Sequence, residues 1–189
     1  MSRIEKKFNE LKNEKRKALV TFISSCDPNF QSSQKIINSL PSFGADLIEL
    51  GLPFSDPMAD GPTIQKSSQR AIESGFNIKK TFKLVQNFRK INQTVPIILM
   101  GYFNTIFQYG LSNFFQDSNS FGVDGIIIVD LPPEEEHLIQ NFVLKNNLSI
   151  IRLLTPTTSE KRLKKILKNA RGFLYYVSIM GITGTKKPS

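Results

Sequence analysis

The sequence contains a single cysteine, Cys26, and a single histidine, His137. One cysteine cannot form an internal disulfide, and neither residue has a companion at the spacing of a Cys/His catalytic pair or a zinc site. Also absent is an apolar run of the roughly 18–20 residues that span a bilayer, and the polar N-terminus does not resemble a signal peptide. We therefore expect a cytoplasmic protein without a metal ion and without a membrane segment.

Acidic residues are outnumbered, because 25 Lys and Arg against 16 Asp and Glu give a formal net charge of +9. A basic excess can indicate a face that binds nucleic acid. The lysines, however, are spread over predicted helices, for example at Lys79, Lys83, Lys161 and Lys165. They are not interleaved with the aromatic side chains of a strand-binding groove. We expect solvated helix faces and no nucleic-acid partner, with a mild attraction for anionic substrates.

Apolar runs and helical patterns alternate along the 189 residues, a length that suits one domain with a substantial core. Nearly continuous apolar runs predict strands that are covered on both faces. They span 18–24, 46–52, 96–101, 124–129, 148–154 and 173–178. Apolar residues at 3.6-residue spacing predict helices over 32–40, 78–91, 133–145 and 159–169, with one more starting at Pro62 and another over about 2–14.

This alternation predicts an α/β fold with a parallel sheet and right-handed crossovers. No GxGxxG motif or P-loop follows the first strand, which excludes the commonest nucleotide-binding forms of the open sheet. The spacing still allows an open doubly wound sheet or a barrel. A closed (β/α)8 barrel has eight strands and typically about 250 residues. With six predicted strands, either the sheet is open or the chain stops early.

The densest polar chemistry follows the second predicted strand, in the segment 49–65, which reads Glu-Leu-Gly-Leu-Pro-Phe-Ser-Asp-Pro-Met-Ala-Asp-Gly-Pro-Thr-Ile-Gln. Strand alternation places Glu49 with Leu47 and Gly51 on one face, and Ile48 with Leu50 on the other. The wholly apolar face should pack on helices, so Glu49 should point into a barrel near its active-site end. Burial should raise its pKa, which suits proton transfer near neutrality. The alternative is an ion pair with a distant Arg or Lys.

Asp60 lies in a turn-rich part of the same segment, just before Pro62. Turn and capping chemistry alone would account for Asp-Gly-Pro-Thr, and Asp56 in Ser-Asp-Pro fits a turn initiator. The residues by themselves leave a structural and a functional role for Asp60 equally open.

The segment 49–65 resembles the signature of tryptophan synthase α subunits nearly residue for residue. Further similarities follow in order along the chain: Leu-Met-Gly-Tyr-Phe-Asn at 99–104, Gly-Val-Asp-Gly at 122–125, Asp-Leu-Pro-Pro-Glu at 130–134, Leu-Thr-Pro-Thr at 154–157 and Gly-Ile-Thr-Gly at 181–184. The resemblance runs from about residue 18 to the last residues. It implies a (β/α)8 TIM barrel, of which residues 1–189 form a single partial domain with about six of the eight βα units.

The resemblance also implies an activity. Members of this family cleave indole-3-glycerol phosphate to indole and glyceraldehyde 3-phosphate, a retro-aldol step without metal or organic cofactor. Carried over by motif, Glu49 is the general acid–base that protonates indole C3, and Asp60 accepts the indole N–H. The implied substrate-binding residues are the slot-lining Phe22, Met100, Tyr102, Ile127 and Tyr175, together with Thr183 and Gly184 in a mobile loop that closes over the substrate.

The family's α subunit binds a β subunit in an α2β2 heterotetramer, and the pyridoxal phosphate belongs to that partner. Asp56, Pro57 and Asn104 match partner-facing positions. Family members continue with two further βα units that hold the substrate phosphate. The resemblance therefore leaves two expectations: a lyase of which this chain is a part, or an inert truncated remnant that at most docks on the β subunit.

Overall fold

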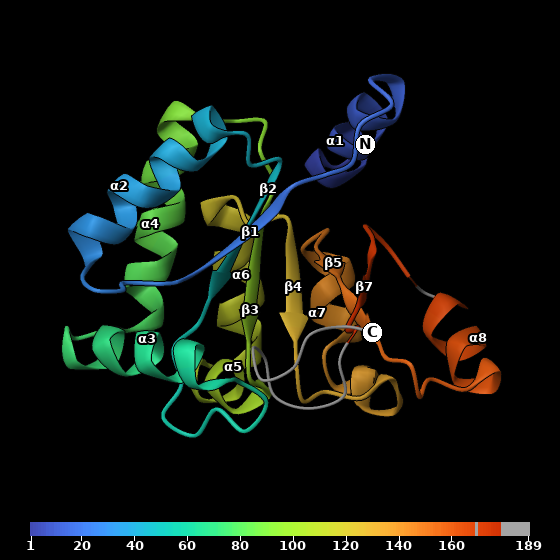
Figure 1. Ribbon diagram of the computed structural model, residues 1–189. Coiled ribbons are helices and arrows are strands. Elements are labelled where there is room, and N and C mark those ends of the chain that lie inside the picture. Colours follow the sequence, from blue (N-terminus) through green and yellow to red (C-terminus); the bar gives the residue numbers. More distant parts are fainter. Residues whose placement is uncertain (169, 179–189) are drawn as a thin grey trace.

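The computed structural model describes residues 1–168 and 170–178. Within these ranges, five parallel strands form one sheet in the order in which they occur along the chain, and two further strands form a small second sheet. The strands are β1 (Val20–Ser24), β2 (Leu47–Gly51), β3 (Ile97–Gly101), β4 (Gly125–Ile128) and β5 (Ser149–Ile150), then β6 (Arg152–Leu154) and β7 (Leu174–Tyr176). Figure 1 shows them as a curved set whose carboxyl ends point down the page.

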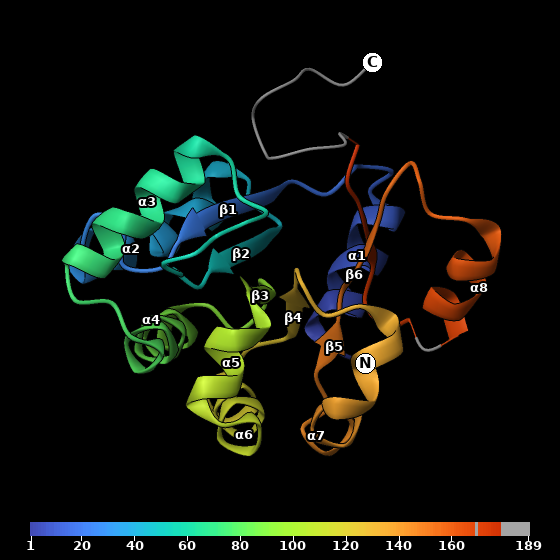
Figure 2. The same ribbon diagram turned by 90° about the horizontal axis from the view of Figure 1, so that it is seen from below.

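Apart from α1, the helices connect the strands and lie on the outside of this curve, as Figure 2 shows from the carboxyl ends of the strands. The α-helices are α1 (Arg3–Asn13), α2 (Phe30–Ser39), α3 (Pro62–Glu73), α4 (Ile78–Ile91), α5 (Phe103–Tyr109), α6 (Leu111–Phe121), α7 (Gln140–Lys145) and α8 (Glu160–Lys168), and two 3-10 helices are η1 (Leu40–Phe43) and η2 (Pro133–Leu138). Side chains of Asn29 and Asn77 cap α2 and α4 by accepting a backbone N–H of the first turn. The predicted parallel α/β arrangement is confirmed.

Two hydrophobic clusters lie on opposite faces of the strands. The outer cluster joins the sheet to the helices and contains Ile48 and Leu50 of β2, as the alternation predicts. The inner cluster is built around Ile98, Ile127 and Ile151 and is completed by Ile4. Fully burying such a side chain contributes about 1.5–3 kcal/mol. The outer cluster therefore fixes the helices, and the inner one fills the concave side of the sheet.

Helix α1 closes the amino ends of the strands, at the end opposite to α3 and α5 in Figure 1. Arg3 of α1 donates to Asp124 Oδ1 at 2.9 Å, and Arg89 of α4 donates to Asp124 Oδ2 at 2.6 Å. The backbone N–H of Ile97 also donates to Asp124 Oδ2, at 2.8 Å. We call these four residues the Asp124 network. It ties α1 and α4 to the start of β3 and β4.

The predicted strand 148–154 is divided in the structure. Its first part, β5, pairs with β4, whereas its second part, β6, pairs with β7. Ile151, between the two, still donates its backbone N–H to Ile126 O at 2.9 Å. The first residues of this stretch therefore pair with β4, and the last residues pair with β7. One continuous strand was the wrong expectation, because alternation in the sequence does not report how the sheet curves.

The predicted helix 133–145 is also interrupted. The 3-10 helix η2 ends at Leu138, Ile139 is its C-cap, and α7 begins at Gln140. Ile139 enters the outer cluster with 1% of its surface exposed. Glu136 of η2 makes a two-point ion pair with Arg152.

Helices α5 and α6 were not expected from the sequence. Gly110, with φ 91°, separates them, and this left-handed conformation is one that glycine adopts without strain. Helix α5, with seven residues, is too short to give a clear 3.6-residue pattern by itself. None of the helices in the described part of the chain is long and apolar enough to cross a membrane.

Candidate active site

Glu49 is the residue from which the candidate site is built. It lies in the middle of β2, and its register partners are Phe22 on β1 and Ile98 on β3. Only 3% of its surface is exposed, and within the described part of the chain Oε1 has no hydrogen-bond partner. Burial raises the pKa of the Glu49 carboxyl from its ordinary 4.5 to about 7, as expected from the strand pattern. The alternative expectation was an ion pair with a distant Arg or Lys, and Oε1 forms no such pair with the described residues.

A buried carboxyl without a partner lowers the stability of a fold. An unsatisfied buried polar group costs about 1–3 kcal/mol, and more when it is charged. Proteins retain such groups mainly where a perturbed pKa serves chemistry. At neutral pH a carboxyl with a pKa near 7 is present in both protonation states, so Glu49 can give a proton and take one back.

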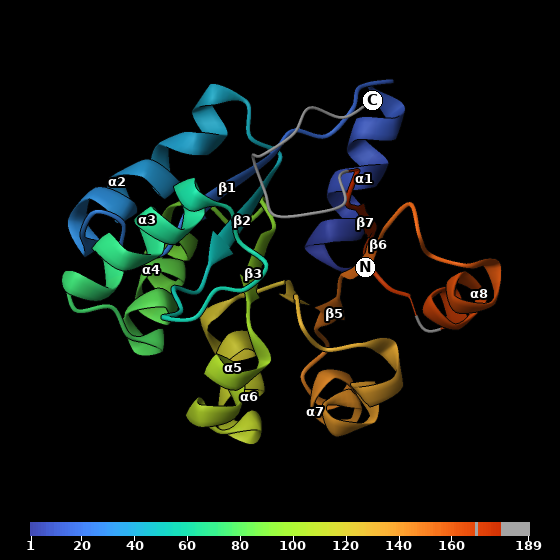
Figure 3. The ribbon, with the colours of Figure 1, turned by 60° about the horizontal axis from the view of Figure 1, so that its bottom comes forward.

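A cavity of about 190 Å³ opens over Glu49 at the carboxyl ends of the strands, the end that comes forward in Figure 3. Its lining combines apolar walls with two carboxylates. The lining residues are Phe22, Ser24, Glu49, Gly51, Leu52, Asp60, Ile64, Ser68, Met100, Gly101, Tyr102, Val129 and Tyr175. The lining therefore suits an aromatic ligand that lies between the apolar walls and contacts the two carboxylates.

Gly51 gives the cavity part of its shape. A Cβ at this position would lie 2.5 Å from Cζ of Phe22 and 2.8 Å from its Cε2. The ring of Phe22 therefore crosses the place that any larger residue would occupy. The Gly51 of the motif permits an aromatic wall directly beside Glu49.

Asp60 enters the cavity from the loop between β2 and α3. Burial raises the pKa of its carboxyl, and a hydrogen bond from the side chain of Tyr102 acts in the opposite direction. Tyr175 of β7 lies close enough to Glu49 that, after burial, the charge of Glu49 contributes to raising the tyrosine pKa. The two carboxylates thus share one cavity whose surroundings disfavour negative charge.

Six residues expected at the site line this cavity together: Glu49, Asp60, Phe22, Met100, Tyr102 and Tyr175. Ile127 does not line it and packs in the inner cluster instead. Val129, two residues further along the chain and on the same face, takes the position at the cavity. Thr183 and Gly184 lie outside the described residues.

The expected partner-facing residues lie on the loops at this same end. Asp56 and Asn104 are exposed, and Pro57 is half-buried. Two large apolar side chains beside them are also open to solvent, Met58 at 73% and Phe107 at 56% exposure. Met58 follows Pro57 directly, and Phe107 lies one helical turn after Asn104, so both belong to the same two segments.

Ser24, Ile64 and Ser68 line the cavity but were not expected there. Ser24 follows Phe22 at the two-residue spacing of one strand face, which is a signal that the sequence contains. Ile64 and Ser68 are four residues apart on α3 and so share one helix face. Ser24 also hydrogen-bonds Ser67 of α3 at 2.6 Å, which holds α3 against the end of β1.

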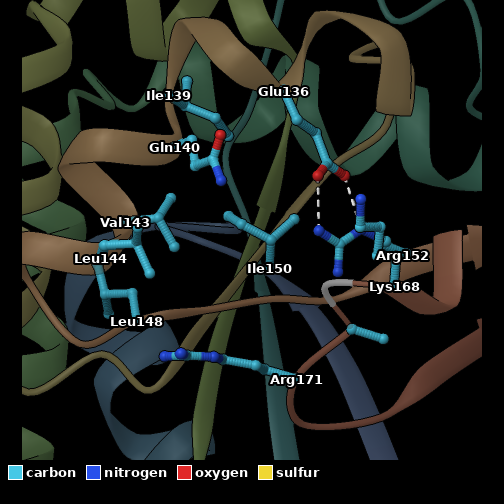
Figure 4. Close-up of a pocket in the computed structure, with 11 residues that line it drawn as sticks. Glu136, Ile139, Gln140, Val143, Leu144, Leu148, Ile150, Arg152, Lys168 and Arg171 are labelled. Atoms are coloured by element: carbon cyan, nitrogen blue, oxygen red, sulfur yellow. Dashed lines mark hydrogen bonds and ion pairs between the residues drawn. The ribbon is translucent and has the colours of Figure 1, made fainter. Parts of the chain in front are cut away.

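A larger cavity, of about 230 Å³, lies elsewhere, between α7 and the segment that leads into β7. Figure 4 shows its apolar wall, which includes Val143, Leu148 and Ile150, and the two dashed contacts between Glu136 and Arg152. These contacts measure 2.7 and 2.5 Å. Because its acid is neutralised by a buried arginine, this cavity lacks the reactive group that the smaller one has.

No group of three or more His, Cys, Asp or Glu side chains that could hold a metal ion occurs among residues 1–168 and 170–178. Cys26 is buried, and burial raises the pKa of its thiol. The polar chemistry of the cavity therefore comes from carboxyl and hydroxyl groups.

Comparisons with known proteins connect this geometry to one family. A family model described as "Tryptophan synthase alpha chain" matches residues 8–189. The tryptophan synthase alpha chain of Granulibacter bethesdensis is 53% identical over 185 residues, which cover 98% of this chain and 66% of that protein. The chain therefore spans slightly less than two thirds of that relative.

Solved structures agree with the sequence comparisons. Tryptophan synthase subunit alpha from Legionella pneumophila superposes with a TM-score of 0.91 at 42% identity, covering 94% of this chain and 68% of that one. A chain from the tryptophan synthase α2β2 complex of Pyrococcus furiosus gives a TM-score of 0.80 at 38% identity, with 84% and 67% covered. The curved parallel sheet with its outer helices is thus part of a TIM barrel.

Proposed function

Because the chain belongs to the tryptophan synthase alpha chain family, we propose that it contributes the acid–base site of a carbon–carbon lyase. The proposed reaction is the cleavage of indole-3-glycerol phosphate to indole and glyceraldehyde 3-phosphate. The observation that carries the proposal is the buried carboxyl of Glu49, whose Oε1 has no partner and whose pKa burial raises to about 7, in a cavity shared with Asp60.

Glu49 performs both proton transfers in this proposal. Its protonated carboxyl donates a proton to indole C3, which makes the ring an electron sink. The bond from C3 to the glycerol carbon then breaks, and its electron pair returns to the ring. The hydroxyl on the departing carbon loses its proton to the Glu49 carboxylate, which yields the aldehyde and restores the acid. A pKa near the working pH is what such a two-way role requires.

Asp60 stabilises the ring during this sequence. Protonation at C3 places positive charge on the indole nitrogen, and a nearby carboxylate that accepts its N–H stabilises that charge. Asp60 must be ionised to do this, although burial raises its pKa. The flat ring would lie between apolar walls that include Phe22, Met100 and Tyr175.

We also propose a β subunit as the partner, with the pyridoxal phosphate held by that subunit and not by this chain. Support comes from the α2β2 complex in which a similar chain occurs. The exposed Met58 and Phe107 lie beside Asp56, Pro57 and Asn104, at the end of the barrel where the cavity opens. Exposed apolar side chains surrounded by polar ones are typical of a protein–protein contact.

The test is Glu49→Gln in the complete gene product that carries this sequence, assayed for indole release with the β subunit present. The amide keeps the size of the side chain but cannot transfer the proton. Loss of a general acid–base lowers turnover by about 10²–10⁴-fold. Glu10→Gln, at an exposed position of α1, serves as the matched control and should leave the rate unchanged.

Near-normal turnover of Glu49→Gln would refute the assigned role. If the unaltered gene product releases no indole with its partner present, the lyase proposal fails. An inert remnant that only docks on the β subunit would then be the better account.

A further inference from the structure

Tyr102 connects Asp60 to the neighbouring strand. It follows β3 directly, and 3% of its surface is exposed. Its hydroxyl oxygen accepts the backbone N–H of Ala59 at 2.9 Å, and its ring packs on Phe54 with ring centroids 5.1 Å apart. Phe54 lies near the start of the loop between β2 and α3, and Ala59 lies near its end. A single aromatic side chain therefore contacts both arms of the loop that carries Asp60.

The same hydroxyl interacts with the Asp60 carboxylate. Because its oxygen accepts from Ala59, its hydrogen remains available to be donated to Asp60. This hydrogen bond lowers the pKa of Asp60 against the effect of burial. Burial is the main cause that raises the pKa of Tyr102 to about 12, so the phenol keeps its proton at neutral pH.

The backbone around Tyr102 is held by neighbouring loops. The carbonyl of Tyr102 accepts the N–H of Thr105 in the first turn of α5, at 3.2 Å. The next residue, Phe103, donates its N–H to Asp130 Oδ1 in the loop after β4, at 2.7 Å. The backbone of Tyr102 is thus held in place by hydrogen bonds, whereas Asp60 lies on an irregular loop.

We propose that Tyr102 is a positioning residue for Asp60: its hydroxyl holds the chain next to Asp60 through the N–H of Ala59 and donates to the Asp60 carboxylate, and its ring supports the loop through Phe54. This inference rests on the function proposed above and assigns Tyr102 a role through Asp60, in addition to its place in the lining of the cavity. Placing an acceptor accurately matters because a carboxylate that stabilises developing charge acts only at hydrogen-bond distance.

Tyr102→Phe in the complete gene product tests this role, since it keeps the ring against Phe54 and removes the hydroxyl. A hydrogen bond to a charged group contributes about 1.5–3 kcal/mol, so kcat for indole release should fall by about 10–100-fold. KM should change less. The acidic limb of the pH–rate profile should move to higher pH, because Asp60 loses the donor that favours its charged form.

Tyr109→Phe is the matched control. Tyr109 also donates its hydroxyl to a carboxylate, that of Asp117, at 2.6 Å, and burial likewise raises its pKa to about 12. It lies at the end of α5 and does not line the cavity. Tyr109→Phe should leave kcat and the pH profile unchanged, which separates the loss of a buried hydroxyl from an effect on Asp60.

A second readout does not depend on turnover. The midpoint of the Asp60 carboxyl, followed by carbon NMR, should rise in Tyr102→Phe and stay constant in Tyr109→Phe. In an Asp60→Asn background, Tyr102→Phe should have little further effect on kcat, because the two residues act as a unit.

An unchanged Asp60 midpoint in Tyr102→Phe overturns the inference, whether or not the protein is active. An active protein whose pH profile and kcat do not respond to Tyr102→Phe overturns it as well, and leaves the lyase proposal standing. Absence of indole release together with a raised Asp60 midpoint refutes the lyase proposal and the role of Tyr102 in that reaction.

Discussion

Two acidic residues, Asp124 and Glu49, lie buried on neighbouring parts of the same sheet, with 8% and 3% of their surfaces exposed. Asp124, at the amino end of β4, receives hydrogen bonds from Arg3, Arg89 and the N–H of Ile97. Glu49, in the middle of β2 and open to the cavity at the carboxyl ends, has an oxygen with no hydrogen-bond partner among the described residues. The same functional group is thus fully neutralised at one end of the barrel and left uncompensated at the other.

The difference shows that residues at one end of the strands serve stability and that residues at the other end serve chemistry. At the amino ends, the Asp124 carboxylate is matched by two guanidinium groups, and α1 and α4 are tied to the sheet by the Asp124 network. At the carboxyl ends, burial raises the Glu49 pKa, and no counter-charge from residues 1–168 or 170–178 stabilises its ionised form. In α/β barrels, residues at the first end serve mainly stability, whereas the second end carries the active site.

Asp124→Ala should give the largest loss of stability. It leaves Arg89, whose side chain is 7% exposed, without its counter-charge and leaves the N–H of Ile97 unpaired. Breaking a buried pair in this way costs about 3–5 kcal/mol. Urea unfolding measures the change. Glu10→Ala, in an exposed pair on α1, should change stability by less than about 1 kcal/mol. Equal losses of stability in Asp124→Ala and Glu10→Ala would contradict the view that the buried network stabilises the fold more than an exposed pair does.

Glu49→Gln should increase the stability of the protein at alkaline pH, whereas Asp124→Ala decreases it. The folded pKa of Glu49 is above its unfolded value of 4.5, so the native state binds more protons between pH 4.5 and about 7. Stability therefore falls as pH rises through this window, by about 3 kcal/mol in total. Glutamine cannot ionise, so the variant should gain up to this amount relative to the unaltered protein at pH 8.

The measurement is urea unfolding of both proteins from pH 4.5 to 8. The difference between them should grow with pH and level off above about pH 7. A difference that does not change with pH would show that Glu49 is not held in the protonated form by burial.

Gly51→Ala should impair the aromatic wall next to Glu49. The new Cβ would overlap the ring of Phe22, and overpacking of this kind costs about 1–3 kcal/mol. The KM for the indole substrate should rise by roughly tenfold, as one misplaced methylene in an apolar pocket does. In the double variant Gly51→Ala/Phe22→Leu, the smaller side chain removes the overlap. The two losses should therefore be less than additive; strict additivity would contradict this packing.

Arg70→Ala should have the smallest effect. Arg70 of α3 contacts both carboxylate oxygens of Asp27 at 2.8 Å, but its own side chain is 52% exposed. Exposed pairs contribute little to stability, because water and salt screen them. Thermal unfolding at low and high salt measures this. A loss as large as that of Asp124→Ala would mean that burial is not what distinguishes the Asp124 network.

Much of this contrast could be predicted from strand alternation. The two-residue period places Glu49 inward and Ile48 outward, and continuous apolar strands predict a sheet covered by helices. The motif that begins at Glu49 also predicts the family. The elevated pKa of Glu49 followed from burial without a neighbouring basic residue in sequence, and the structure bears it out.

Other features depend on three-dimensional curvature and on loop conformation. Alternation gives the face of β4 but not the depth at which a side chain lies, so Ile127 was expected where Val129 lines the cavity. The contact between Tyr102 and Ala59 joins residues 43 positions apart through an irregular loop. The predicted helix 133–145 is divided because its first part is a 3-10 helix and its second part an α-helix, a change that the apolar spacing does not reveal.

The most direct measurement is the titration of the Glu49 side-chain carboxyl by carbon NMR, with Glu49→Gln used to assign its resonance. The account predicts a midpoint at about pH 7, well above the ordinary 4.5. A midpoint at or below 4.5 would mean that the carboxyl is solvated or paired, and would contradict the claim that this end of the barrel holds an uncompensated acid.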